Sequence, residues 1–327
     1  MFHKRALQCA GARMGIISNN GELIREYRYF NDTVMESILT NVHRLVEIPF
    51  EEGRDADFIV VDDPQVNPRV EINEKTCFCA GDFSRWEKTC ADNRYSLFGN
   101  LGLFFRYTMA TLERFHNIYS FHASSMYIPS NNTILLIVGG AGAGKTIYLL
   151  EAIMSGWKIL STEMTHFRFT DTGYEVIKGA LFDNIRVGNL VYDFPEVPNK
   201  LGIQVPQVED VWGHKIALDL TSLQAEDVYV NPRLQIINAH IESHRPTANV
   251  TVMKKKDKVV WTLYQNASEK LSPPWLMYEQ MPVAGCDDPP LAWKRLETMR
   301  RIVDEVDMLP VKSIVAGAKN CLEGIET

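Results

Sequence analysis

Apolar and polar positions along the chain form short runs, and most show the alternation or the bounded apolar stretches typical of β-strands. Before residue 95 the predicted strands are 23–30, 43–50 and 56–63. A helix capped by Asn31 or Asp32 is predicted after the first strand, because these side chains accept hydrogen bonds from the first helical turn. The segment 95–118 repeats apolar residues at helical spacing with few charges, which predicts a helix with a broad buried face.

The centre of the chain carries the clearest succession of elements. The apolar runs 119–129 and 133–138 are separated by a short polar turn, which predicts a hairpin. A glycine-rich stretch follows, and 146–156 then reads as a helix that ends at Gly156, since glycine readily adopts the left-handed conformation found after a last helical turn. The next run, 157–163, predicts another strand.

The rest of the chain continues as strands and then turns helical. Further strands are predicted at 165–171, 174–181, 214–220, 234–242, 248–255 and 258–264. The lysine-rich stretch 254–258 is interpreted as an exposed hairpin turn. The last predicted element is an amphipathic helix within 289–309, with leucines, isoleucine and valines on one face and arginines on the other. This mixture of elements predicts an α/β fold.

Charge and composition narrow the classes of function. The net charge is −7, with 46% hydrophobic and 23% charged residues, which argues against general binding to nucleic acids or anionic membranes. No apolar run reaches membrane-spanning length and no secretory signal is recognised, so a cytoplasmic location is expected. We expect free thiols rather than disulfides or a metal site at the six cysteines, which are Cys9, Cys77, Cys79, Cys90, Cys286 and Cys321.

One motif points to specific chemistry. The sequence GGAGAGKT satisfies G-x-x-x-x-G-K-[ST], the phosphate-binding loop, and it lies between a predicted strand and a predicted helix. Its glycines let backbone N–H groups converge on phosphate oxygens, the lysine neutralises them, and the threonine hydroxyl binds magnesium. The predicted nucleotide-binding residues are Gly139, Gly140, Ala141, Gly142, Ala143, Gly144, Lys145 and Thr146. ATP and Mg²⁺ are therefore the expected cofactors.

Magnesium in such sites takes a second protein oxygen from an acid at the end of a nearby strand. Glu163 closes the strand 157–163, which returns directly from the helix after the loop, and it is the predicted second metal ligand beside Thr146. Asp219, within the strand 214–220, is the rival candidate.

The segment FHASSMYIPSNNTILLIVGGAGAGKTIYLLEAIMSGWKILSTE resembles the HPr kinase/phosphorylase superfamily and, more loosely, phosphoenolpyruvate carboxykinases. His122, Ala123 and Ser124, the loop, Gly156 and the strand ending at Glu163 fall in the family's order. The resemblance spans roughly 95–280 and is specific around 120–163. It implies a P-loop core of this type, with an N-terminal α/β region at 1–94, the P-loop domain at 95–285 and a C-terminal helical segment at 286–327.

One departure from the family affects the chemistry. The family carries two successive acids, a catalytic base and then a metal ligand, and here they align with Thr162 and Glu163. A threonine hydroxyl cannot act as a general base at neutral pH. Glu163 then serves both tasks, or another group such as Asp171 or Asp183 substitutes, or phosphate transfer is lost. His122 is the candidate for orienting the acceptor, and the cations considered for the γ-phosphate are Arg186, Lys215 and Arg245.

The resemblance implies an ATP- and magnesium-dependent kinase in which Lys145, His122 and Glu163 are the catalytic candidates. The acceptor would be the hydroxyl of a peptide or protein serine or of a small metabolite. Two alternatives stay open: an ATP-binding regulatory protein with little or no kinase activity, and a kinase that acts on a nucleotide or nucleic-acid hydroxyl. No membrane partner is expected and nucleic acid is disfavoured, while the apolar face of the C-terminal helix leaves a homo-oligomer open.

Overall fold

The fold is described from a computed structural model that covers residues 2–24, 45–53, 55–242 and 244–326. The chain divides into two compact units, one of residues 1–117 with 268–292 and the other of 118–267 with 293–327. This division cuts the chain at other places than the predicted boundaries after residues 94 and 285. The helix predicted after Asn31 and most of the strand predicted at 23–30 lie outside the described residues.

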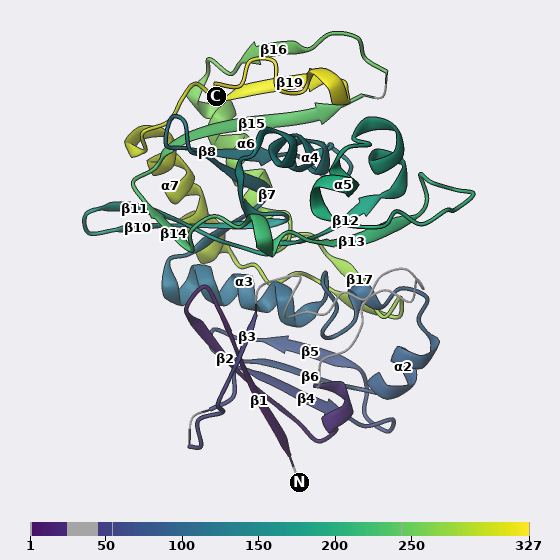
Figure 1. The fold of residues 1–327 in the computed structure, drawn as a ribbon. Coiled ribbons are helices and arrows are strands. Elements are labelled where there is room, and N and C mark those ends of the chain that lie inside the picture. Colours follow the sequence, from purple (N-terminus) through teal and green to yellow (C-terminus); the bar gives the residue numbers. More distant parts are fainter. Residues whose placement is uncertain (1, 25–44, 54, 243, 327) are drawn as a thin grey trace. The chain divides into compact units, whose positions relative to one another are not determined.

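The first unit is built on a six-stranded sheet with the order β3-β1-β2-β4-β6-β5 (Figure 1). Its strands are β1 (His3–Cys9), β2 (Ala12–Ser18), β3 (Val46–Ile48), β4 (Phe58–Asp62), β5 (Arg69–Ile72) and β6 (Cys77–Gly81). The central strands β2, β4 and β6 are parallel. Short elements complete the unit: η1 (Gly21–Leu23), α2 (Phe83–Thr89), η2 (Asn93–Tyr95), β17 (Trp275–Met277) and β18 (Met281–Val283).

The long helix of this unit, α3 (Leu103–His116), is shorter than the predicted helix 95–118. It begins late because the chain before it is tightly folded: a Cβ on Gly102 would lie 2.0 Å from the carbonyl oxygen of Ser96. α3 is buried along most of its length, as its broad apolar pattern predicted. Phe58 of β4 packs edge-on against Phe104, with ring centres 5.3 Å apart.

The second unit holds a nine-stranded sheet with the order β14-β11-β10-β7-β8-β15-β19-β16, in which β9 also pairs with β7. Its strands are β7 (Tyr119–Ile128), β8 (Thr133–Val138), β9 (Lys158–Ser161), β10 (Met164–Thr170), β11 (Gly173–Ile177), β14 (Val228–Val230), β15 (Arg233–Ile241), β16 (Asn249–Val252) and β19 (Lys312–Ala316). The predicted hairpin is confirmed, since β7 and β8 pair antiparallel. β15 is parallel to both β8 and β19, so these three strands end at one edge of the sheet.

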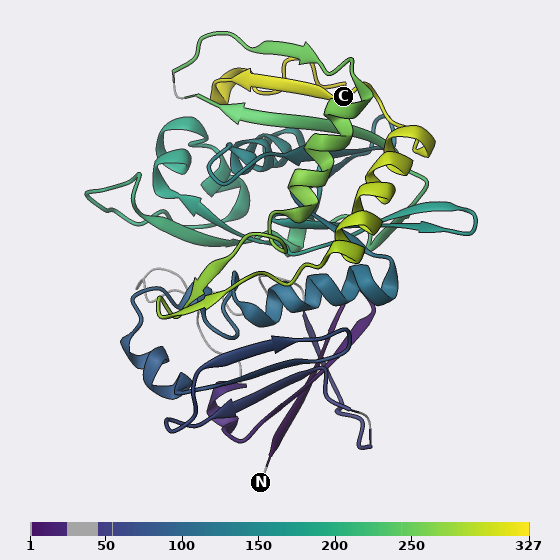
Figure 2. The ribbon, with the colours of Figure 1, turned by 180° about the vertical axis from the view of Figure 1, so that it is seen from behind.

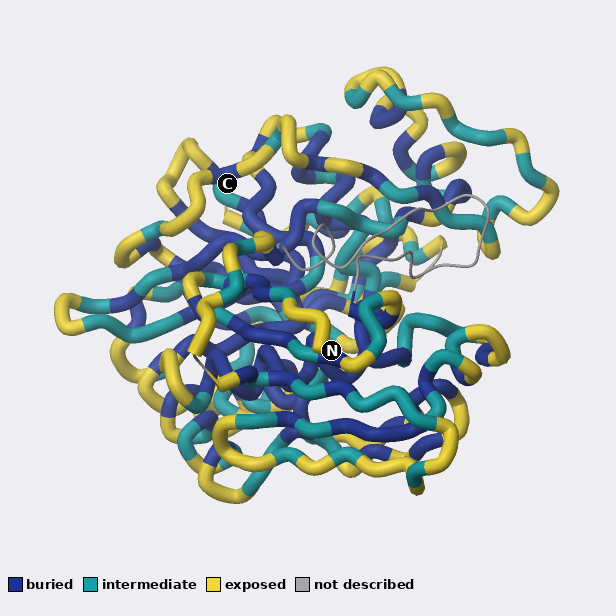
Figure 3. The backbone as a smooth tube through the Cα atoms, turned by 90° about the horizontal axis from the view of Figure 1, so that it is seen from below, coloured by how far each residue is buried: buried dark blue, intermediate teal, exposed yellow. Residues whose placement is uncertain are grey.

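Helices cover both faces of this sheet. α4 (Lys145–Ser155) contacts β7, β8 and β9 on one face, and α6 (Lys256–Ser268) and α7 (Pro289–Glu305) lie behind the other (Figures 1 and 2). The core on the latter side joins Phe121 and Leu136 of the sheet to Leu263 of α6 and Met299 of α7. The central hairpin is consequently buried along almost its whole length. In Figure 3 the buried stretches lie inside, and exposed stretches are found in turns at the periphery.

The segment 182–223 lies between β11 and β14 and adds no strand to the nine-stranded sheet. It consists of β12 (Phe182–Arg186), the π-helix η3 (Asn189–Asp193), α5 (Val197–Leu201), β13 (Lys215–Asp219) and η4 (Thr221–Leu223). β12 and β13 form a two-stranded sheet of their own. β12 was not predicted from the sequence.

Several C-terminal predictions were wrong. The predicted strand 258–264 lies in α6, and Lys256 to Lys258 of the predicted turn begin that helix. Val259, Leu263 and Ala267 are its buried apolar positions, and their spacing of four is helical. α7 confirms the amphipathic helix, but Arg295, placed on its polar face, is fully buried. The segment 286–327 is not purely helical, because β19 joins the large sheet and only the 3-10 helix η5 (Ala318–Asn320) follows it.

Candidate functional site

The glycine-rich loop 139–144 connects the end of β8 to the start of α4. Two of its glycines are required by close packing: a Cβ on Gly144 would lie 2.2 Å from Cγ1 of Ile241, and one on Gly139 would lie 2.7 Å from Cβ of Ala143. Gly140 differs, because nothing lies within 4 Å of a Cβ placed there. The ends of the loop are therefore held tightly against β15, and its middle faces open space.

Hydrogen bonds fix the shape of this loop. The Ala143 N–H donates to the Gly140 carbonyl at 3.1 Å, and the Ile241 N–H donates to the Ala143 carbonyl at 2.9 Å. Lys145 Nζ lies over the loop and donates to the carbonyls of Gly139 at 2.9 Å and Gly140 at 3.2 Å. Because the first N–H groups of a helix have no acceptor within the helix, the loop and the start of α4 present backbone donors beside this ammonium group.

Thr146, in the first turn of α4, contacts an acid in the segment 182–223. Its hydroxyl donates to Oδ2 of Asp183 on β12 at 3.1 Å. Asp183 was only one of several possible substitutes for the missing acid, with no geometric support in the sequence. The structure brings it to the loop, while Asp171 lies in the exposed turn between β10 and β11.

The environment of Asp183 opposes its ionisation. The pKa of its carboxyl is raised to about 6, first by burial and then by the nearby charge of Glu163, against the lowering effects of the Asn184 N–H, the Thr146 hydroxyl and Lys145. A carboxyl whose pKa is raised by burial beside a second carboxylate is typical of functional sites and of metal-binding sites.

Glu163 and His122 form the second part of the cluster. Oε1 of Glu163 lies 3.7 Å from Nε2 of His122, which is buried on β7. The His122 carbonyl accepts a hydrogen bond from the Asn266 side chain of α6 at 2.9 Å, which fixes this part of β7. The sequence predicted both residues as site candidates, and the structure places them together.

Three of the other candidates make their contacts elsewhere. The Asp219 carboxylate accepts hydrogen bonds from the Thr221 N–H at 2.9 Å and the Thr221 hydroxyl at 2.5 Å, so it caps a turn. Arg245 forms an ion pair with Glu242 at 2.6 Å. Arg186 donates to the Trp212 carbonyl. These contacts connect none of the three to the loop or to Asp183.

Three oxygen-bearing side chains lie at the start of α4 and in the acidic cluster beside it. In the described part of the chain, no group of three or more His, Cys, Asp or Glu side chains is arranged to hold a metal ion. Thr146, Asp183 and Glu163 offer one hydroxyl and two carboxylates. Mg²⁺ commonly takes one or two protein carboxylates and fills its other positions with phosphate oxygens and water. All six cysteines are buried, and none is in a disulfide.

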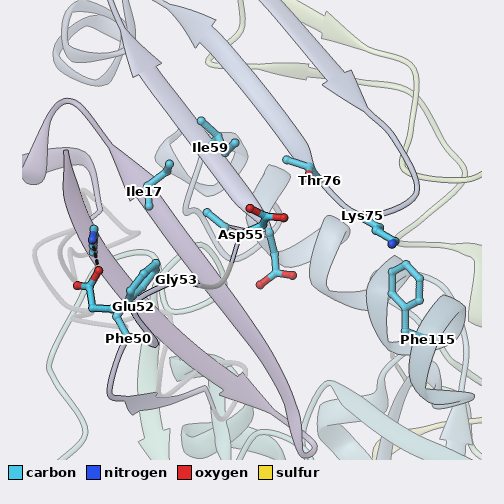
Figure 4. A pocket seen from close by; sticks show the side chains of 12 residues that line it. Ile17, Phe50, Glu52, Gly53, Asp55, Ile59, Lys75, Thr76 and Phe115 are labelled. Carbon is cyan, nitrogen blue, oxygen red and sulfur yellow. Dashed lines mark hydrogen bonds and ion pairs between the residues drawn. The ribbon is translucent and has the colours of Figure 1, made fainter.

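A cavity of about 750 Å³ lies in the first unit and contains none of the predicted site residues. Ile17 of β2 and Ile59 of β4 line it, and Asp55, Lys75 and Phe115 surround it (Figure 4). Both charge signs are present on its walls, so they favour no single class of ligand.

No protein-family model matches the chain, and no curated protein matches it. Among the described residues, no helix is both long and apolar enough to cross a bilayer.

Proposed function

We propose that the chain is an ATP- and magnesium-dependent phosphotransferase of the HPr-kinase-like type that moves the γ-phosphate to a hydroxyl group. The observation that supports this most directly is the hydrogen bond between Thr146 and Asp183, which joins the glycine-rich loop to the acidic cluster. The acceptor hydroxyl belongs to a peptide or protein serine or to a small metabolite.

The loop residues would hold the nucleotide phosphates. Backbone N–H groups of the loop and of the first turn of α4 would bind the β-phosphate, and Lys145 would exchange its contacts with the Gly139 and Gly140 carbonyls for phosphate oxygens. Thr146 and Glu163 would bind Mg²⁺, which neutralises charge that develops on the transferred group.

Asp183 would take the proton of the acceptor hydroxyl. Its carboxylate would replace the first acid of the family's pair, which aligns with Thr162. Asp183 is hydrogen-bonded to the proposed metal ligand Thr146, so Glu163 need not serve as both base and metal ligand. His122, held beside Glu163, would orient the acceptor. Phosphoryl transfer passes through a loose transition state, so positioning and charge neutralisation contribute more than the base does.

A substitution at Gly140 separates a phosphate cradle from an ordinary turn. Gly140→Ala should leave the free energy of unfolding within about 0.5 kcal/mol of wild type, because the added methyl group meets no protein atom. It should reduce the rise in melting temperature produced by Mg·ATP, because bound phosphates would need the open space into which the methyl group projects. A variant with unchanged ATP-dependent stabilisation would show that nucleotide does not bind there.

Magnesium dependence tests the role of Glu163. Glu163→Gln should raise the magnesium concentration needed for half-maximal ATP-dependent stabilisation by about tenfold or more, because an amide oxygen is a weaker ligand than a carboxylate. Asp219→Asn is the matched control, since that carboxylate caps a turn, and it should leave the requirement unchanged. The reverse result would assign the metal to Asp219.

A further inference from the structure

The strand that runs beside β7 is interrupted next to the site. β9 pairs with the later part of β7 at Ser125 to Tyr127, and β10 pairs with the earlier part at Tyr119 to His122. The two residues between β9 and β10 are Thr162 and Glu163. A break of this kind redirects side chains out of the regular sheet pattern, and such breaks are common beside functional sites.

Thr162 connects this break to the segment that leads into β12. Its N–H donates to the Ala180 carbonyl at 2.8 Å, and its hydroxyl lies 2.6 Å from the Phe182 carbonyl and 3.2 Å from that of Ala180. On the other side, the Ser124 hydroxyl of β7 donates to the Thr162 carbonyl at 2.6 Å. The Phe182 carbonyl belongs to the peptide bond that precedes Asp183.

We infer that Thr162 is a positioning residue: its hydroxyl holds the start of β12 against the sheet so that the Asp183 carboxylate reaches Thr146. The effect on kcat that follows from this inference rests on the proposed function. The anchoring of β12 rests on the hydrogen bonds of Thr162 alone. In this chain the acid expected at position 162 comes from another segment, and the residue at 162 anchors that segment.

The hydroxyl has no substitute nearby. Thr162 is buried, with 4% of its surface exposed, and valine at this position would keep its shape while removing the donor to the Phe182 carbonyl. Because an unpaired buried carbonyl is unfavourable, the start of β12 would shift to find another partner. Asp183 would then move relative to Thr146, while the loop and Lys145 stay in place.

The test is a double-mutant cycle between Thr162→Val and Asp183→Asn. Thr162→Val should lower kcat about tenfold to a hundredfold with little change in the KM for ATP, the usual range for residues that orient a reacting group. Thr162→Ser, which keeps the hydroxyl, should restore most of kcat. In the Asp183→Asn background, Thr162→Val should have almost no further effect on kcat, because the group that it positions is already gone.

Thr165→Val is the matched control. Thr165 is also buried and its hydroxyl donates to the Ala123 carbonyl at 3.1 Å, but none of its hydrogen bonds reaches β12. It should lower the urea midpoint of unfolding without changing kcat. Equal and additive losses of kcat from Thr162→Val and Asp183→Asn would overturn the inference, as would a loss that serine does not restore.

Unfolding measurements keep this test apart from the proposed function. The same cycle, followed by the urea midpoint at pH 8 without nucleotide, should show a coupling between Thr162→Val and Asp183→Asn that is absent between Thr165→Val and Asp183→Asn. If unfolding shows the coupling but wild type transfers no phosphate, Thr162 anchors β12 and the proposed phosphotransferase activity is wrong. If wild type transfers phosphate but unfolding shows no coupling, the proposed activity stands and Thr162 does not anchor β12.

Discussion

Lys145→Ala is expected to lower phosphotransfer about a hundredfold to a thousandfold and to abolish the stabilisation of the protein by Mg·ATP. The ammonium group lies against the loop carbonyls, and its removal takes away positive charge that would face the phosphates at the start of α4. The fold should persist, because the two hydrogen bonds lost are at the surface and contribute about 1 kcal/mol each. Thermal unfolding with and without Mg·ATP measures both effects.

Lys158→Ala provides the control for this substitution. Lys158 is an exposed lysine at the start of β9 in the same unit, so the two variants remove the same charge from the protein. It should retain both the stabilisation and the activity. Equal losses in the two variants would indicate a general effect of charge, and retained ATP stabilisation in Lys145→Ala would place the nucleotide elsewhere.

Asp183→Asn should have the second large effect, a fall in kcat of about a hundredfold or more at unchanged magnesium requirement, because the group that accepts the acceptor's proton is lost. Asp171→Asn, in an exposed turn, should leave kcat unchanged. A variant that instead needs more magnesium and regains its rate at high magnesium would make Asp183 a metal ligand and contradict the assignment of the base.

The same substitution should stabilise the free protein at neutral and alkaline pH. The pKa of Asp183 is raised from 3.8 to about 6, so the folded state binds the proton more tightly than the unfolded state does. Folding then loses stability as pH rises from about 4 through 6, by up to about 3 kcal/mol for a shift of roughly two units. Without nucleotide or magnesium, Asp183→Asn should therefore unfold at higher urea than wild type at pH 8.

Most of this advantage should be lost at pH 4, where the folded-state carboxyl is protonated and the unfolded-state carboxyl is close to its pKa of 3.8. Urea unfolding at the two pH values measures it, and Asp219→Asn, which removes an exposed carboxylate, serves as the reference. An advantage at pH 4 equal to that at pH 8 would mean that burial and the Glu163 charge do not oppose the ionisation of Asp183.

The segment 119–163 is where the sequence predicted the structure best. Three local signals predicted it: an apolar run, a glycine-rich stretch, and a helical segment that stops at Gly156. Each of these elements is confirmed, and Gly156 has a left-handed φ of 75°. The sequence named His122 and Glu163 as separate candidates, and the pairing of β7 with β9 and β10 brings them together.

The errors come from two physical sources. The segment 258–264 is rich in β-branched and aromatic residues, which favour strands, but its buried positions recur every four residues and the helix prevails. The sequence could not favour Asp183 over Asp171 as the substitute acid. The position of Asp183 depends on β12, a short strand outside the main sheet that no local pattern marks. The only trace of it was the small polar residue at 162 where an acid was expected.

The measurement that tests the central claim most directly is the fate of the γ-phosphate. Wild type, Lys145→Ala and Asp183→Asn are incubated with γ-labelled ATP and magnesium, with and without fractionated cell extract, and the label is followed into protein, metabolites and free phosphate. Label on a hydroxyl-bearing acceptor with wild type, lost in both variants, is the predicted result. Tight ATP binding by wild type with neither transfer nor free phosphate would contradict the phosphotransferase and favour a regulatory ATP-binding protein.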